Sequence, residues 1–370
     1  MNKSSLRAWD AADEYLLSYL AEDNLLEKAH GGAVVVVNDN FGALGLSLHS
    51  FHPVLMTDSY LAMQAVSQNA EAAGLDELVQ INTLEDPCQY FPAEAGHKAA
   101  VVLIRIPKSL AMLEDQLHRV RPLLTKDTVI IAAAMTRNIH NSTLALFEKI
   151  IGPTRTSLAR KKARLVFSEY DENLQVADNP WPKSYRIDYE GTKPGLSDHA
   201  GIFSAGRLDI GTRFLLEHIP SNRDFHSIID LACGNGVLGI AAAIKNPQAR
   251  LVFTDESYMA VESAASNFEN HFAGQQQRDA QFLQTDCLQG VEADSASLVL
   301  CNPPFHQQHA ISDHIAWQMF SQARDVLQQG GELWVVGNRH LGYHAKLKRL
   351  FGNREMIAGN KKFVIIKVVK

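Results

Sequence analysis

The sequence predicts an α/β protein built from two tandem copies of one doubly wound domain, each with a mostly parallel sheet. Short aliphatic and β-branched runs alternate with amphipathic segments along the whole chain. This alternation is typical of buried parallel strands with helices on both faces of the sheet. The same order of segments recurs about 200 residues later, which indicates a duplication. A chain of 370 residues is also long enough for two full cores.

The first copy is predicted over residues 1–170. Leucines at helical spacing indicate a helix within residues 1–30, and a second helix is expected over residues 63–73. Strands are expected at residues 33–37, 54–58, 101–106, 129–134 and 164–168.

The second copy is predicted over residues 201–370, because six of its segments match segments of the first copy in the same order. Residues 34–37 match 228–231, 42–45 match 236–239, 57–62 match 254–260, 101–104 match 298–301, 138–140 match 338–340, and 161–162 match 361–362. A shared order over a whole domain is much harder to obtain by chance than any single match.

A linker is predicted over residues 171–200, which are rich in Pro, Gly, Asp and Tyr. Three of its aromatic residues, Trp181, Tyr185 and Tyr189, have basic neighbours. Such residues can stack on RNA bases. More often they pack a linker onto its domain.

Composition bounds the setting and the partners. The four cysteines form no CxxC pair and no metal-ligand spacing, so no metal is expected. Without a signal-like start or a long apolar run, we expect a reducing cytoplasm and no membrane.

The net charge of −6 argues against a protein that coats nucleic acid. Residues 101–164 nevertheless hold 12 Lys/Arg against 4 Asp/Glu, and residues 339–370 hold 9 against 1. These two basic segments are either phosphate-binding faces or ordinary solvated surfaces.

A glycine-rich loop follows the first strand of the second copy. Cys233, Gly234, Asn235 and Gly236 lie between that strand and a helix, and residues 234–239 satisfy the pattern GxGxxG. Alone this pattern is weak, and it equally suits an enzyme that uses NAD. It marks these four residues as candidates for binding a nucleoside cofactor.

Three acidic residues mark successive strand ends beside this loop. The Asp230 carboxylate would repel a pyrophosphate but would hold a cationic amine, such as that of S-adenosylmethionine. Asp255 is placed to accept ribose hydroxyls, and Asp286 to accept from an adenine amino group. A single Asp at a strand end is commonly a helix N-cap. Three in succession favour a nucleoside site.

The run Asn302-Pro303-Pro304-Phe305 is the sharpest signal in the chain. An exocyclic amine on a nucleobase is a poor nucleophile, because its lone pair is delocalised into the ring. The Asn302 side-chain oxygen and the Pro303 carbonyl can accept its two N–H bonds and direct the lone pair, while the prolines keep the backbone rigid. Phe305 offers a face on which a flipped base can stack. The alternative is a loop that is merely stiffened by proline.

The first copy lacks these residues. Its loop has Asn40 and Phe41 before the glycine that matches Gly236, and we expect Phe41 and the missing glycine to fill the ligand space. Arg105 stands where the second copy has Asn302, and Asn82 where it has Asp286. The first copy is therefore predicted to be degenerate.

These residues resemble the tandem-domain class I methyltransferases that modify the N2 amine of guanine in ribosomal RNA. Members of that family have two Rossmann-like domains, the first degenerate, and the resemblance covers essentially the whole chain. Residues 302–310, 338–341 and 361–364 look more like the members acting on large-subunit RNA than those acting on the small subunit. Residues 203–204 and 208–212 match the family's entry into the catalytic domain, which is expected to close over the cofactor.

The resemblance implies transfer of a methyl group from S-adenosylmethionine to the N2 amine of a specific guanine in 23S ribosomal RNA. It assigns the cofactor to Asp230, Gly234, Asp255 and Asp286, and the target amine to Asn302. Enzyme alternatives are another planar amine, in 16S RNA, in DNA adenine or cytosine, or in a protein glutamine. A different alternative is a non-catalytic RNA-binding assembly factor. No obligate protein partner is evident.

The degenerate first domain is predicted to dock RNA. The residues expected to contact phosphates there are Arg105, Lys108, Arg137, Arg160, Lys161 and Lys162. A scaffold without RNA contacts is the alternative for this domain.

Overall fold

The computed structural model describes residues 7–22, 25, 32–191, 193–274, 278–304 and 309–370. The chain forms two compact units, residues 1–181 and 182–370. Each unit is organised around a seven-stranded sheet. Within the described residues, no helix has the length and apolarity needed to cross a membrane.

Among its described residues, the first unit has seven strands and five α-helices. The strands are β1 (Ala33–Val37), β2 (Val54–Thr57), β3 (Val79–Asn82), β4 (Ala99–Arg105), β5 (Val129–Met135), β6 (Thr154–Thr156) and β7 (Ala163–Ser168). The helices are α1 (Ala11–Glu22), α2 (Ala43–Ser47), α3 (Tyr60–Ala72), α4 (Leu110–Val120) and α5 (Asn141–Ile150). The predicted strands are therefore confirmed, and β3 and β6 were not foreseen.

The second unit repeats this set and adds a hairpin before it. The strands are β8 (Lys183–Arg186), β9 (Gly195–Asp198), β10 (Ser227–Leu231), β11 (Arg250–Asp255), β12 (Ala280–Gln284), β13 (Ala296–Cys301), β14 (Leu327–Asn338), β15 (Glu355–Gly359) and β16 (Phe363–Val369). The helices are α6 (Ile210–Leu216), α7 (Val237–Lys245), α8 (Tyr258–Phe272), α9 (His309–Val326) and α10 (Tyr343–Phe351).

The two sheets have the same topology. The first has the order β3-β2-β1-β4-β5-β7-β6 and the second β12-β11-β10-β13-β14-β16-β15. In each, five strands are parallel and the last two run antiparallel to their neighbours. The predicted duplication and the doubly wound, mostly parallel fold are confirmed.

The register corrects two of the matched segments. Val37 pairs with Met56 as Leu231 pairs with Thr254, so Thr57, and not Asp58, corresponds to Asp255. Thr57 pairs with Asn82 as Asp255 pairs with Gln284, so Leu84, and not Asn82, corresponds to Asp286.

The second correction concerns the turn after β14. Asn338 pairs with Phe363, the first residue of β16, whereas Met135 pairs with Ala163, the first residue of β7. Asn338 therefore corresponds to Met135 and not to Asn138. The sequence match was shifted by three residues, because both turns contain an Asn and a His at similar spacing.

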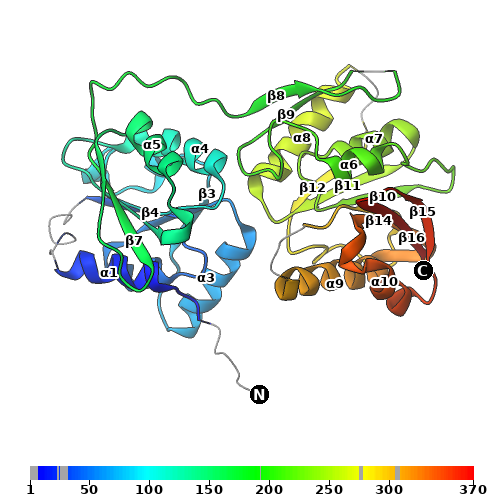
Figure 1. Ribbon diagram of the computed structural model, residues 1–370, viewed down its shortest axis with the longest axis horizontal. Coiled ribbons are helices and arrows are strands. Elements are labelled where there is room, and N and C mark those ends of the chain that lie inside the picture. Colours follow the sequence, from blue (N-terminus) through cyan, green and yellow to red (C-terminus); the bar gives the residue numbers. More distant parts are fainter. Residues whose placement is uncertain (1–6, 23–24, 26–31, 192, 275–277, 305–308) are drawn as a thin grey trace. The chain divides into compact units, whose positions relative to one another are not determined.

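Helices cover both faces of each sheet (Figure 1). In the second unit, α6, α7 and α8 pack on one face, and α9 and α10 pack on the other. In the first unit, α1, α2 and α3 share one face, and α4 and α5 share the opposite one. The strands between these layers are buried on both sides, which explains their continuous apolar runs.

The boundary between the units differs from the expectation that residues 171–200 form a linker. The Trp181 indole N–H donates to Glu114 of the first unit at 3.1 Å. The next residues form the β8–β9 hairpin, which packs on α8 because Asn267 exchanges hydrogen bonds with the Ser197 backbone. Trp181 is 7% exposed and Tyr189 is 8% exposed. These two aromatic residues are therefore packed onto the protein, and their rings are not free to stack on RNA bases.

Candidate active site

The predicted site residues of the second unit meet at the carboxyl edge of its sheet. Strands β12, β11, β10 and β13 are neighbours in that order, so the residues at their ends lie side by side. This group is called the edge site here. Its described members are Asp230, Gly234, Asp255, Asp286 and Asn302. Phe305, the predicted stacking residue, lies outside the described residues.

The two loop glycines have different roles. Gly234 has φ +55°, and a Cβ at this position would meet only Ile202, at 3.9 Å. Gly236 has φ +77°, and a Cβ there would lie 2.9 Å from the Ala264 Cβ. Gly236 therefore allows α7 to pack closely on α8. Gly234 leaves open space beside the loop, as the approach of a ligand requires.

Asp230 is fully buried, and its two carboxylate oxygens have different environments. Oδ2 accepts from the Gly239 backbone N–H at 2.7 Å. Oδ1 has no hydrogen-bond partner among the described residues. Burial, followed by the charge of Asp255, raises the pKa of Asp230 to about 8, against the effect of the Gly239 N–H. A buried acceptor without a donor is costly, so Asp230 is suited to receive a donor or a cation.

Asp255 connects the end of β11 to the glycine loop. Its Oδ2 accepts from the Gly234 N–H at 3.0 Å, and its Oδ1 accepts from the Ser257 N–H at 3.1 Å. Burial raises its pKa, whereas these backbone donors lower it. The Glu256 backbone N–H is a third such donor. Because a carboxylate has about four acceptor positions, one remains for a hydroxyl donor. Asp286, partly exposed at the end of the neighbouring strand, is contacted by the Cys287 thiol at 3.4 Å.

Asn235 and Cys233 are engaged inside the unit. The Asn235 amide donates to the Tyr185 hydroxyl and to Asp198 Oδ1, both at 2.9 Å, and its oxygen accepts from the Val237 N–H at 3.2 Å. This side chain, predicted to bind the cofactor, therefore ties the loop to the β8–β9 hairpin. Cys233 is buried, and burial raises the pKa of its thiol well above the ordinary value.

Asn302 is held by the first turn of α6. Its amide nitrogen donates to Thr212 Oγ1 at 2.9 Å and to Asp209 Oδ2 at 3.3 Å. The same Asp209 oxygen caps α6 by accepting from the Thr212 N–H at 2.9 Å. A carboxylate only accepts hydrogen bonds, so the Asn302 amide group must face it. The opposite side of the amide, Oδ1, is buried and has no partner among the described residues.

The matching position in the first unit is blocked by an ion pair. Arg105 replaces Asn302, and its guanidinium contacts Asp10 and Asp13, each at 3.0 Å. Asp10 caps α1 through the Ala12 N–H, as Asp209 caps α6. Phe41, expected to fill the ligand space beside the corresponding loop of the first copy, is 50% exposed. The Arg105 ion pairs therefore occupy the position that corresponds to the Asn302 amide, and these contacts could not be predicted from the sequence.

Only some of the cations predicted to dock RNA are available. Arg105 is committed to its ion pairs, with a side chain only 15% exposed. Arg160 pairs with Glu22 at 3.3 Å, and Lys161 pairs with Glu14 at 2.8 Å. The cations without a side-chain partner among the described residues are Lys108, Arg137 and Lys162.

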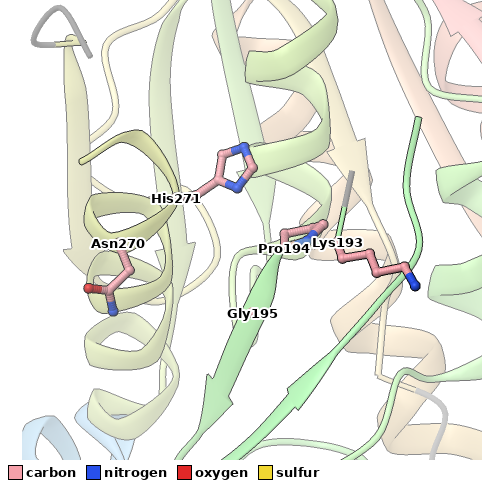
Figure 2. Close-up of a pocket in the computed structure, with 5 residues that line it drawn as sticks. All are labelled: Lys193, Pro194, Gly195, Asn270 and His271. Atoms are coloured by element: carbon pink, nitrogen blue, oxygen red, sulfur yellow. The ribbon is translucent and has the colours of Figure 1, made fainter. Parts of the chain in front are cut away.

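A separate pocket lies away from the edge site. It is lined by residues 193–195 and by Asn270 and His271 at the end of α8 (Figure 2). Because α8 starts at the carboxyl edge and runs back, its last turn lies toward the amino edge. The Lys193 side chain extends away from Asn270 and His271, so no set of functional groups converges there.

The residues that hold Asn302 and Asn235 in place were not predicted from the sequence. Asp209 and Thr212 were noticed only as part of a matching segment, and Asp198 not at all. The spacing of Asp209 and Thr212 is that of a helix N-cap and its N3 residue, a signal that predicts the start of a helix but not its contact with Asn302.

The repeated sheets and the edge site, with its glycine loop, strand-end carboxylates and Asn-Pro-Pro turn, define a tandem class I methyltransferase that keeps its site in the second copy. Residues 1–172 match the family model of the RLMG N-terminal domain, and residues 194–367 match that of the Methyltransferase small domain.

The similar proteins agree over the full length. A Ribosomal RNA large subunit methyltransferase G from Streptomyces coelicolor is 51% identical, over 100% of this chain and 95% of its own. One from Aeromonas salmonicida is 48% identical, over 100% and 93%. The chain belongs to the ribosomal RNA large subunit methyltransferase G family.

A solved structure shows the same two-domain fold. It is a T. thermophilus 16S rRNA N2 methyltransferase in complex with AdoMet and guanosine. It matches with a TM-score of 0.72 at 17% identity, over 92% of this chain and 88% of its own.

Proposed function

We propose that this protein transfers a methyl group from S-adenosylmethionine to the exocyclic N2 amine of a guanine in 23S ribosomal RNA. One observation supports this most strongly. The Asn302 amide is held by Asp209 and Thr212, so that its buried, unpartnered oxygen is presented at the edge site. An acceptor fixed in this way is suited to a planar amine with N–H groups to donate.

The edge site has the features that S-adenosylmethionine needs. The open space beside Gly234 admits a ligand close to the backbone, and the remaining acceptor position of Asp255 suits a ribose hydroxyl. The unpartnered oxygen of Asp230 suits a cationic amine, and Asp286 remains our candidate for the adenine amino group. When bound, the cofactor would supply an electrophilic methyl group.

The residues at the end of β13 would orient the target amine. Asn302 Oδ1 and the Pro303 carbonyl accept its two N–H groups, which directs the nitrogen lone pair toward the methyl group. Because the acceptors are held before the base arrives, orientation requires little rearrangement during the reaction. No strong base is needed beforehand, since the amine proton becomes acidic only when nitrogen has been alkylated.

A basic rim beside the edge site supports an RNA substrate. It consists of Arg339, Lys361 and Lys362, which lie at the turns after β14 and before β16. These turns are adjacent, because the Arg339 N–H donates to the Lys362 carbonyl at 3.0 Å. Among the described residues, none of the three has a carboxylate within ion-pair distance. Unpaired cations next to the site would bind backbone phosphates around the target nucleotide.

For the first domain we propose a supporting role in RNA docking. The basis is its exposed cations without a side-chain partner among the described residues, Lys108, Arg137 and Lys162. The chain's four cysteines are free thiols, and we propose the reducing cytoplasm as the setting.

The proposed function is tested by transfer of a labelled methyl group to purified RNA. The acceptors are naked 23S RNA, assembled large subunits, 16S RNA and DNA, with nucleoside analysis of each product. We expect N2-methylguanosine in 23S RNA, either naked or assembled. A methylated adenine, cytosine or protein glutamine would replace the substrate assignment. RNA binding without transfer to any acceptor would indicate an assembly factor.

A further inference from the structure

Asn338, the last residue of β14, has a second buried acceptor without a partner. Its Oδ1 is shielded from solvent and has no hydrogen-bond partner among the described residues. It also does not cap the 3₁₀ turn Arg339–Leu341 that it precedes. A local structural role for this oxygen is therefore not evident, and leaving it unsatisfied is costly.

The sheet register places Asn338 on the same face as Asn302. Cys301 pairs with Val335 in the parallel β13–β14 ladder, so Asn302 follows opposite Val336, and Asn338 lies two residues further along. Residues two apart on a strand share a face. Asn338 also pairs with Phe363, and a Cβ at Gly211 would meet both the Phe363 ring, at 3.2 Å, and Asn302 Oδ1, at 3.6 Å.

The degenerate copy has lost both acceptors. By register, Met135 corresponds to Asn338, and Arg105 stands in place of Asn302. Neither side chain can accept a hydrogen bond as an amide oxygen does. The two buried oxygens therefore occur together in the unit that keeps the site.

We propose that Asn338 reads the base: its Oδ1 accepts the N1–H of the guanine whose N2 amine is held at Asn302. This inference rests on the proposed function. Guanine presents N1–H directly beside its N2 amine, whereas adenine and cytosine present a ring acceptor next to their amine. Two neighbouring acceptors therefore favour guanine and leave the other bases with an acceptor facing an acceptor.

The test uses RNA with 2-aminopurine at the target position. This base keeps the N2 amine but has a ring acceptor in place of N1–H. For the wild-type protein we expect kcat/KM on 2-aminopurine RNA to be lower than on guanine RNA by ~10²-fold or more. For Asn338→Ala we expect kcat/KM on guanine RNA to fall by roughly 5- to 150-fold, but on 2-aminopurine RNA by less than about 3-fold. Asn338→Asp keeps an acceptor and is expected to recover part of the activity on guanine RNA.

The comparison separates two kinds of failure. An equal loss on both RNAs in Asn338→Ala, with an active wild-type protein, would contradict base reading by Asn338 and leave the proposed function intact. A wild-type protein that methylates N2 in neither RNA would overturn the proposed function, and base reading by Asn338 with it. Melting temperature and cofactor affinity show whether the variant remains folded, and a folded variant with full guanine activity would also contradict the proposal.

Discussion

At the scale of residues, the site depends on polar atoms that the fold leaves without partners. Asp230 Oδ1 and Asn302 Oδ1 are both buried, and neither has a hydrogen-bond partner among the described residues. Each belongs to a side chain whose other polar atom is bonded, Asp230 to Gly239 and Asn302 to Thr212. The bonded atom fixes the orientation, and the free atom is directed to a ligand. Such groups lower stability in exchange for function.

Asn302→Ala should abolish transfer while preserving cofactor binding. Removing an acceptor aimed at the reacting amine is expected to lower kcat by ~10²- to 10³-fold. The measurements are single-turnover methyl transfer and calorimetric titration with S-adenosylmethionine. Near-normal turnover would show that Asn302 does not hold the amine.

The stability of the wild-type protein should depend on the ionisation of Asp230. Its pKa is raised from 3.8 to about 8 by burial, so between these values the folded chain keeps a proton that the unfolded chain has lost. The free energy of unfolding should therefore fall as pH rises through this window and level off above it. Asp230→Asn should remove this contribution. The melting temperature of the variant should therefore rise relative to that of the wild type as the pH increases from about 5 to about 9.

One outcome would contradict the expected ionisation of Asp230. If the difference in melting temperature between Asp230→Asn and the wild type stays constant over that pH range, the carboxyl group does not change its protonation there. Comparison of the two proteins is essential, because burial also raises the pKa of Asp198 and Asp255.

At the scale of elements, the start of α6 connects helix capping to the amine site. Asp209 caps the helix and also accepts from Asn302, while the Thr212 hydroxyl holds the same amide. The first unit has the same arrangement with a different result, since Asp10 caps α1 and forms an ion pair with Arg105. One structural contact between a helix start and a strand end thus supports an acceptor in one copy and an ion pair in the other.

Thr212→Val and Asp209→Ala separate capping from positioning. Thr212→Val removes the 2.9 Å bond to Asn302 but keeps the backbone N–H that Asp209 caps. We expect kcat to fall ~10-fold in both variants, with little change in KM for RNA, because the Asn302 amide loses its fixed orientation. Only Asp209→Ala should also lose ~1 kcal/mol of stability with the helix cap.

Thermal melts and steady-state kinetics test this pair of variants. Full kcat in Thr212→Val would show that Asn302 needs no support from α6. A similar loss of stability in both variants would mean that the activity change reports folding and not orientation.

At the scale of the whole molecule, the duplication allows a basic turn in one copy to be compared with the matching turn in the other. Both copies have a Lys-Lys turn before the last strand of the repeat, at residues 161–162 and 361–362. In the first copy, Lys161 and its neighbour Arg160 are paired with Glu14 and Glu22 of α1. In the second copy, Lys362 lies over the Phe363 ring at 5.1 Å, and no carboxylate of the described residues neutralises the turn.

Matched triple variants should differ in the salt dependence of RNA binding. Each phosphate contact contributes ~0.7 to 0.9 to the slope of log affinity against log salt. Replacing the rim, Arg339, Lys361 and Lys362, by alanine should therefore lower the slope by about 2 to 3. The matched change of Arg160, Lys161 and Lys162 should lower it by about 1, since two of these cations are already paired. Equal slopes for the two triple variants would contradict the assignment of the rim.

The fold could largely be predicted because its signals are local. Continuous apolar runs such as 33–37 and 298–301 indicate buried strands, and their repetition in order indicates two equal domains. The hairpin β8–β9 was missed because it depends on Asn235 and Asn267, which lie on other elements. The short edge strands β3 and β6 carry too few apolar residues for a periodic signal.

Three properties could be inferred from the sequence: the duplication, the degeneracy of the first copy, and the position of Asp230, Gly234, Asp255 and Asn302 at one sheet edge. These follow from residue types at strand ends, because parallel strands of one sheet end on the same side. Which polar atoms are free depends instead on the packing of the folded chain. Three features depend on contacts between segments about 35 to about 95 residues apart. They are the hydrogen bonds from Asn302 to the start of α6, the Arg105 ion pairs, and the unpartnered Oδ1 of Asn338 among the described residues. Such contacts have no signature in local sequence, because hydrogen-bond satisfaction is a property of the packed chain.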